Sequence, residues 1–201
     1  MKKFFLMIKY LWAALLTGSL LFLLWGNWHL DRYMFSQMSL GMFGQNFLVI
    51  LGVISMLIMI LEMDKFFGWS WTAWMGMKCV NVGISPLHIP YFGLFFTLLI
   101  LVNVPYMALI EEMIFREGTK SWPDAIWRSL VFGLCHCLMG IPIGAGLAMS
   151  VAGMWFSYHY MLGGVEESAL HHGAYNTMLF SCIFLLLLYQ HLPERWRKRT
   201  M

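Results

Sequence analysis

Residues 91–115 read YFGLFFTLLILVNVPYMALIEEMIF, an apolar run that ends close to two adjacent glutamates, Glu111 and Glu112. A helix that spans a bilayer needs roughly 20 mostly apolar residues in succession, and this stretch is long enough. Pro105 lies inside the run, and a proline within a helix removes one backbone hydrogen bond, so we expect a kink there. The stretch therefore predicts a transmembrane helix that carries an acidic pair near one end.

The composition of the whole chain agrees with this stretch. Of its 201 residues, 60% are hydrophobic and 11% are charged, whereas a soluble domain is roughly half apolar and a quarter charged. The net charge of +3 comes mainly from short Lys/Arg runs at the two ends, which we interpret as membrane anchors. Because no stretch alternates basic and aromatic residues, we expect the lipid bilayer as a partner and no nucleic acid.

Successive apolar stretches predict an all-α fold, a polytopic transmembrane helical bundle in which residues 1–201 form a single transmembrane domain. We expect about six spans, at residues 4–26, 46–63, 91–115, 125–141, about 144–161 and 166–189. A polar loop is expected over residues 27–45, and an interfacial amphipathic segment rich in Trp over residues 64–90. Basic runs at both ends favour cytoplasmic termini. An even number of spans, such as six, places both ends on the same side of the membrane. The sequence therefore predicts a multi-pass protein of the cell membrane. The basic residues near 116–128 conflict with that orientation and leave the exact span count open.

The acidic pair is the first motif that indicates chemistry, because an ionisable group inside a bilayer is costly and is a functional candidate by default. Glu112 and Arg116 are four residues apart and share a helical face, so we expect an ion pair that keeps Glu112 ionised. Glu111 points about 100° away and is free for another task. An ordinary cluster of charges at a helix end is the alternative interpretation.

The second motif is Phe132-Gly133-Leu134-Cys135-His136, which places His136 about eleven residues into an expected span. A histidine at that depth is a candidate for proton transfer, although a lone buried histidine more often only packs or forms a hydrogen bond.

The third motif lies in residues 166–176, EESALHHGAYN. Ser168, His172 and Asn176 recur every four residues and share one helical face, and Glu167 and His171 lie on the adjacent face. A polar stripe on an otherwise apolar helix must face the protein interior. It could also be a seam of hydrogen bonds between helices, with no catalytic role.

Taken together, the three motifs supply the groups that hydrolysis of a peptide bond requires. A glutamate can take a proton from water as a general base, and an imidazole N–H and an amide can stabilise the oxyanion that forms. The motifs lie on three separate spans, and antiparallel helices can bring them together.

The order E-E-x-x-x-R, F-x-x-x-H and H-x-x-x-N resembles the CAAX prenyl protease and bacteriocin-processing family, also called CPBP or ABI, over residues 105–178. The resemblance implies an all-helical intramembrane endopeptidase of the glutamic type. It also implies that Glu111 and His136 activate water, that His172 and Asn176 form the oxyanion site, and that Glu112 and Arg116 support them.

We therefore expect an enzyme that cleaves a membrane-embedded or lipid-anchored peptide or protein, without a cofactor or a metal. The candidate catalytic residues are Glu111, Glu112, His136, His172 and Asn176, and the supporting residues are Arg116, Phe132, His171 and Glu167. Two alternatives stay open. One is a metal-dependent peptidase with Glu111, His136 and His172 as zinc ligands, and the other is a non-enzymatic membrane protein with an immunity or scaffold role.

Overall fold

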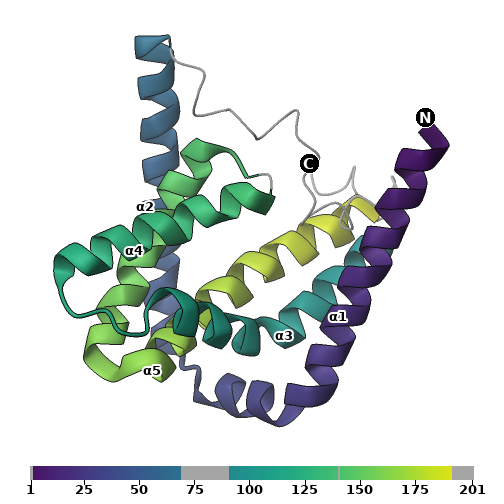
Figure 1. Ribbon diagram of the computed structural model, residues 1–201, viewed down its shortest axis with the longest axis horizontal. Coiled ribbons are helices and arrows are strands. Elements are labelled where there is room, and N and C mark those ends of the chain that lie inside the picture. Colours follow the sequence, from purple (N-terminus) through teal and green to yellow (C-terminus); the bar gives the residue numbers. More distant parts are fainter. Residues whose placement is uncertain (1, 69–90, 140, 192–201) are drawn as a thin grey trace.

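Long helices make up most of the computed structural model, which describes residues 2–68, 91–139 and 141–191 (Figure 1). The elements are α1 (Lys2–Gln37), α2 (Leu40–Phe67), α3 (Phe92–Phe115), α4 (Trp122–Cys135), the short 3₁₀-helix η3 (His136–Met139) and α5 (Ile143–His191). The described residues contain no strand. The predicted all-α fold is therefore confirmed.

Helix α5 is the centre of the molecule, because α2, α3 and α4 all pack against it, whereas α1 packs on α3. Its helical geometry breaks at Gly163 (φ −141°, ψ 15°) and Gly164 (φ 74°, ψ −161°). Glycine adopts the positive φ of Gly164 without the steric penalty that a side chain would add. The break divides α5 into a first arm, residues 143–162, and a second arm, residues 165–191, and Figure 1 shows the second arm turning back from the first.

The expected polar loop over residues 27–45 is wrong, because α1 continues to Gln37 and α2 begins at Leu40. Two polar side chains of this stretch form hydrogen bonds while their backbone stays helical. Asn27 donates to the carbonyl of Leu23 at 3.0 Å, and the buried Asp31 accepts the backbone N–H of Tyr106, one residue after Pro105 in α3, at 3.0 Å. The turn reduces to the residues around Ser39, whose hydroxyl caps α2 by accepting the N–H of Met42.

Four helical segments are long and apolar enough to cross a membrane: Tyr10–Gln37, Leu40–Phe67, Phe92–Phe115 and Ile143–His191. They indicate a membrane protein. The expected six spans are not confirmed, because α4 has only 14 residues and the last two expected spans are the two arms of α5. Most of the interfacial segment expected over residues 64–90 lies outside the described residues, and its first residues end α2.

The crossing of α4 with the first arm of α5 depends on glycine. A Cβ atom added to Gly133 would lie 2.2 Å from the carbonyl oxygen of Gly146, and one added to Gly146 would lie 2.9 Å from the carbonyl oxygen of Gly133. Small residues allow two helix backbones to approach this closely. The close approach brings Phe132 of α4 into a buried cluster with Ala152 and Phe156 of the first arm and Tyr175 of the second.

Candidate active site

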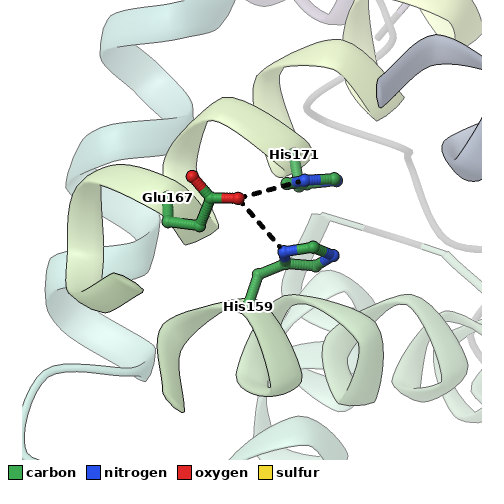
Figure 2. Close-up of side chains that lie close together, drawn as sticks. All are labelled: His159, Glu167 and His171. Carbon is green, nitrogen blue, oxygen red and sulfur yellow. Dashed lines mark ion pairs between the residues drawn. The ribbon is translucent and has the colours of Figure 1, made fainter. Parts of the chain in front are cut away.

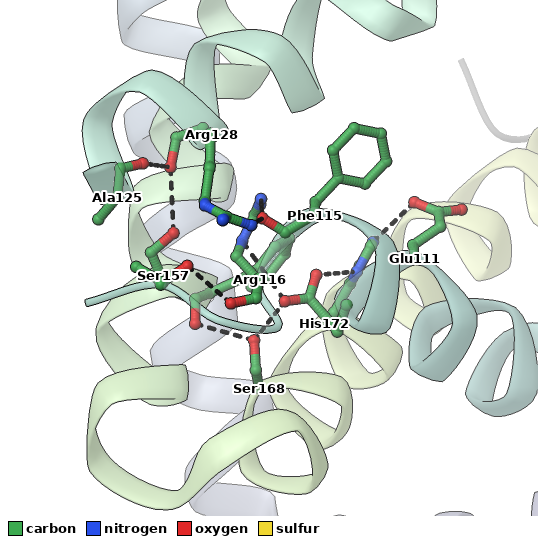
Figure 3. Close-up of polar contacts among 12 residues, drawn as sticks. Glu111, Phe115, Arg116, Ala125, Arg128, Ser157, Ser168 and His172 are labelled. Carbon is green, nitrogen blue, oxygen red and sulfur yellow. Dashed lines mark hydrogen bonds and ion pairs between the residues drawn. The ribbon is translucent and has the colours of Figure 1, made fainter. Parts of the chain in front are cut away.

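Glu112, in the last turn of α3, is the most enclosed acidic group of the site. Its side chain and that of Arg116 are both 0% exposed, and Arg116 Nε lies 3.5 Å from Glu112 Oε2, so the expected ion pair is present. The second arm of α5 supplies two further contacts: Ser168 Oγ donates to Glu112 Oε2, and His172 Nδ1 lies 2.8 Å from Glu112 Oε1 (Figure 3). Glu112 thus joins α3 to α5.

The contact with Glu112 fixes the orientation of the His172 ring. An ionised carboxylate only accepts hydrogen bonds, so Nδ1 carries the hydrogen and Nε2 faces the other way. The ring of Phe156 stacks on His172 with centroids 4.3 Å apart and planes at 16°, and Phe132 contacts it edge-on at 5.5 Å. These contacts hold Nε2 at a defined place.

Glu111 lies on the opposite side of that ring. Its Oε2 is 3.7 Å from His172 Nε2, and its side chain is 31% exposed, in contrast to the full burial of Glu112. Figure 3 shows His172 between Glu111 and the buried contacts around Ser168. A separation of 3.7 Å exceeds a direct hydrogen bond, and at such a distance a water molecule can bridge two polar groups. Glu111 is therefore accessible, while its neighbour Glu112 is held.

The guanidinium of Arg116 completes the buried base of the site. It lies 4.7 Å from the centroid of the Phe132 ring, within the range of a cation–π contact. The same phenylalanine packs against His172, so Arg116 and Phe132 both lie beside this histidine.

His136 begins η3, directly after the last residue of α4, and is half-buried. Its Nδ1 lies 2.9 Å from the carbonyl oxygen of Phe132. A carbonyl oxygen only accepts, so Nδ1 carries the hydrogen, and in a neutral ring Nε2 is the acceptor. The His136 ring contacts one side of Phe132 at 5.0 Å, and His172 contacts the same phenylalanine at 5.5 Å. One aromatic ring thus links the two histidines.

Asn176 is the candidate that the contacts do not bring to the site. It lies one helical turn beyond His172 and is half-buried, and within the described residues it forms no hydrogen bond with Glu111, His136 or His172. Its shared face with His172 follows from helical spacing, but no hydrogen bond in the described structure holds its amide toward these three groups.

The supporting residues Glu167 and His171 belong to a second polar cluster, together with His159 (Figure 2). Glu167 Oε1 lies 3.4 Å from His159 Nδ1 and 3.4 Å from His171 Nε2. Sequence reasoning missed His159. The one signal for it was its position four residues before Gly163, because a break at this glycine pair folds the second arm back toward it.

A metal site requires several ligand atoms close to one another. Among the described residues, a single group of three His, Cys, Asp or Glu side chains places its ligand atoms within 4.8 Å of one another, and it consists of His159, Glu167 and His171. Glu111, His136 and His172 do not form such a group.

No protein-family model, no curated protein and no solved structure matches this chain. The likeness of its three motifs to the CAAX-protease family therefore stays a prediction that rests on the residues themselves.

Proposed function

We propose that the chain is an intramembrane endopeptidase of the glutamic type, similar to the CAAX prenyl protease and bacteriocin-processing family. The observation that carries the proposal is the contrast between two adjacent glutamates. Glu112 is fully buried and bound by Arg116, Ser168 and His172, whereas Glu111 is 31% exposed and lies 3.7 Å from His172 Nε2. The peptidase assigns a role to both carboxylates, whereas a scaffold assigns one only to Glu112.

In the proposed reaction, Glu111 accepts a proton from a water molecule, and the lone pair of His136 Nε2 helps to orient that water. The water oxygen bonds to the carbonyl carbon of the substrate, and the carbonyl oxygen becomes an oxyanion. His172, when Nε2 carries a hydrogen, and the amide of Asn176 donate to that oxyanion. The carbon–nitrogen bond then breaks, and Glu111 returns its proton to the leaving amine.

Glu112 acts as a positioning residue in this scheme. The hydrogen bond between its carboxylate and His172 Nδ1 keeps the imidazole in one orientation, in the way that a carboxylate orients the histidine of a catalytic triad. Preorganised donors of this kind stabilise a transition state without reorganising during the reaction.

The substrate class follows from the surroundings of the site. Glu111 and Glu112 lie near the end of α3, one of the four segments long and apolar enough to cross a membrane. We propose that the chain is a multi-pass protein of the cell membrane and that it cleaves a membrane-embedded or lipid-anchored peptide or protein tail.

The test uses the purified full chain in detergent micelles with a mixture of single-span and farnesylated tail peptides in H₂¹⁸O. We expect cleavage that places one ¹⁸O atom in the new carboxyl group, and loss of this cleavage in Glu111→Gln and His172→Gln. Glu62→Gln changes an exposed carboxylate on α2 and serves as the control. Cleavage by Glu111→Gln at the wild-type rate would contradict the proposal.

A scaffold role is the second candidate, favoured by the way the buried contacts of Glu112 join α3 to α5. The two functions differ in what they require of Glu111. A scaffold uses Glu112, Ser168 and Arg116 and tolerates Glu111→Gln, whereas the peptidase does not.

A further inference from the structure

A cluster of three metal-ligand side chains lies outside the proposed catalytic set, and we call it the α5 cluster: His159, Glu167 and His171. His159 comes from the first arm of α5, and Glu167 and His171 come from the second. Figure 2 shows both imidazole rings turned toward the same oxygen of Glu167. The cluster therefore connects the two arms across the break at Gly163 and Gly164.

The spacing of the three ligand atoms fits a shared metal ion better than direct hydrogen bonds. Each histidine nitrogen lies 3.4 Å from Glu167 Oε1, which is beyond the range of roughly 2.7–3.2 Å for hydrogen bonds of N–H to oxygen. In a tetrahedral zinc site with bonds of about 2.0–2.1 Å, neighbouring ligand atoms are about 3.3 Å apart. The two nitrogen-to-oxygen distances match the edges of such a tetrahedron, and all three ligand atoms lie within 4.8 Å of one another.

The burial of His159 is a second and independent observation. This residue is 6% exposed, and neither of its ring nitrogens has a hydrogen-bond partner among the described residues. Its ring stacks on His171 with centroids 3.4 Å apart and contacts Trp155 edge-on at 4.4 Å. Ring packing explains the burial of its carbon atoms but leaves the polar nitrogens unsatisfied, which is costly inside a protein. A metal ion bound by Nδ1 removes part of that cost.

We propose that the α5 cluster binds one zinc-class divalent ion through His159 Nδ1, His171 Nε2 and a carboxylate oxygen of Glu167. Two imidazoles and one carboxylate are a ligand set typical of zinc, with the fourth position open to water. Magnesium and calcium prefer oxygen ligands and suit the cluster less well. The Glu167 side chain is 36% exposed, which gives an ion a way in.

Asn46 of α2 is suited to support the bound form. Its amide nitrogen lies 3.5 Å from His171 Nδ1, and its amide oxygen is buried without a hydrogen-bond partner in the described part of the chain. Binding of the ion at Nε2 requires the ring hydrogen on Nδ1. The Asn46 oxygen can accept it only if the amide turns and gives up its present 3.0 Å hydrogen bond to the carbonyl of Met42. Partners of this kind orient metal-bound histidines. Coordination also draws the two ring nitrogens together and widens the 18° angle between the rings.

The ion would fix the two arms of α5 relative to each other. The first arm carries Phe156 and the second carries His172, and these two rings stack at 4.3 Å. The site itself does not depend on the proposed peptidase activity, because Glu111 and His136 take no part in it.

The test measures zinc binding to the metal-stripped full chain in detergent by calorimetry, with the metal content determined after gel filtration. We expect one zinc ion per chain, and affinity at least about 100-fold lower in Glu167→Gln, because loss of a ligand exceeds the roughly 10–100-fold effect of outer partners. His159→Gln should lose binding as well. Glu166→Gln changes the neighbouring carboxylate, which accepts from Tyr33, and should bind zinc normally.

Glu111→Gln separates this site from a zinc ion at the catalytic set and should keep full binding. Gel filtration and thermal unfolding verify that each variant is folded, and zinc should raise the melting temperature of the wild type but not that of Glu167→Gln. Absence of stoichiometric zinc in the wild type would overturn the proposal. So would binding that is lost in Glu111→Gln but kept in Glu167→Gln.

Discussion

Two adjacent glutamates in one helical turn occupy opposite environments, and this contrast is the central feature at the scale of residues. Glu112 is buried among three polar partners, and Glu111 is partly exposed beside His172. The helical offset of about 100° between neighbours explains why the two side chains meet different surroundings. The sequence alone therefore predicts that one carboxylate pairs with Arg116 and that the other stays free.

The buried ion pair gives the first prediction. Arg116→Ala leaves the fully buried carboxylate of Glu112 without its cation, so we expect the free energy of unfolding to fall by about 3–5 kcal/mol. Lys65→Ala is the matched control, because it breaks a 2.6 Å pair with Glu62 whose side chains are 72% and 63% exposed. Exposed pairs contribute about 0–1 kcal/mol. Thermal or denaturant unfolding in detergent gives both values.

A double variant tests whether the uncompensated charge is the cause. Glu112→Gln with Arg116→Met removes both charges and should be less destabilised than Arg116→Ala alone. A double variant that unfolds more easily than Arg116→Ala would contradict this explanation.

Helical periodicity predicts which residues of the third motif share a face, and it succeeds for the residues with fixed partners. Ser168 and His172 both reach Glu112, and Glu167 and His171 lie together on the adjacent face. It could not predict His159, because the contact with Glu167 exists only after the chain reverses at Gly163 and Gly164. It also predicts that Asn176 shares a face with His172, but no contact in the described part of the chain brings its amide to the site.

At the scale of elements, tertiary partners decide what the local sequence leaves open. Residues 27–45 contain enough polar side chains to suggest a loop, yet Asp31 is buried against the N–H of Tyr106 in α3. Tertiary contact also decides the role of Gly146 in the first arm, which lies so close to Gly133 of α4 that an added Cβ atom would meet a backbone oxygen.

The crossing of α4 and α5 gives the second prediction. Gly133→Ala would place a Cβ atom 2.2 Å from a backbone oxygen, and backbone cannot move aside as a flexible side chain does. We expect a loss of at least about 1–3 kcal/mol, as for other overpacked sites. Gly44→Ala in α2 is the control, because its added Cβ would have no atom within 4 Å. There, helix propensity alone should stabilise the protein by up to about 1 kcal/mol. Equal melting temperatures of the two variants would contradict the close crossing.

The first turn of α4 gives a prediction about pH. Asp124 accepts a hydrogen bond from Arg128 Nε at 2.9 Å, which lowers the pKa of Asp124 below its ordinary value of 3.8. A carboxyl group whose pKa is lower in the folded state stabilises the fold when ionised. The stabilisation is complete above the unfolded pKa of about 4 and disappears as the pH falls through the folded value.

Melting temperatures of the wild type and of Asp124→Asn, measured from pH 7 down to pH 3, test this prediction. The difference between them should be constant near neutral pH and should shrink below about pH 4. A difference that grows at acid pH would contradict it.

At the scale of the whole molecule, the lengths of the helices favour more crossings than four. Helix α5 has 49 residues, which at 1.5 Å each gives about 73 Å, more than twice the bilayer core of about 30 Å. Its arms of 20 and 27 residues measure about 30 and 40 Å. The 14 residues of α4 and the 4 of η3 add to about 29 Å. We therefore expect each arm, and α4 with η3, to cross the membrane, with Asp124 in the first turn of α4 at the membrane surface.

Cysteine labelling with a membrane-impermeant maleimide tests this topology in a cysteine-free background. Leu40→Cys lies at the turn between α1 and α2 and Leu162→Cys lies at the α5 break, and both native side chains are exposed, by 90% and 64%. Six crossings predict that both cysteines react from the same side of the membrane. Protection of Leu162→Cys from both sides would indicate that α5 crosses only once.

The most direct test of Glu111 as the group that activates water compares the protein termini in the membranes of cells that express the wild type, Glu111→Gln or Glu62→Gln. Mass spectrometry of new N- and C-termini detects cleavage of any membrane protein, whichever one is the substrate. We predict a set of new termini in membrane-anchored proteins that appears with the wild type and with Glu62→Gln and is absent with Glu111→Gln. Identical termini in all three membranes would contradict the assignment of Glu111 as the group that activates water.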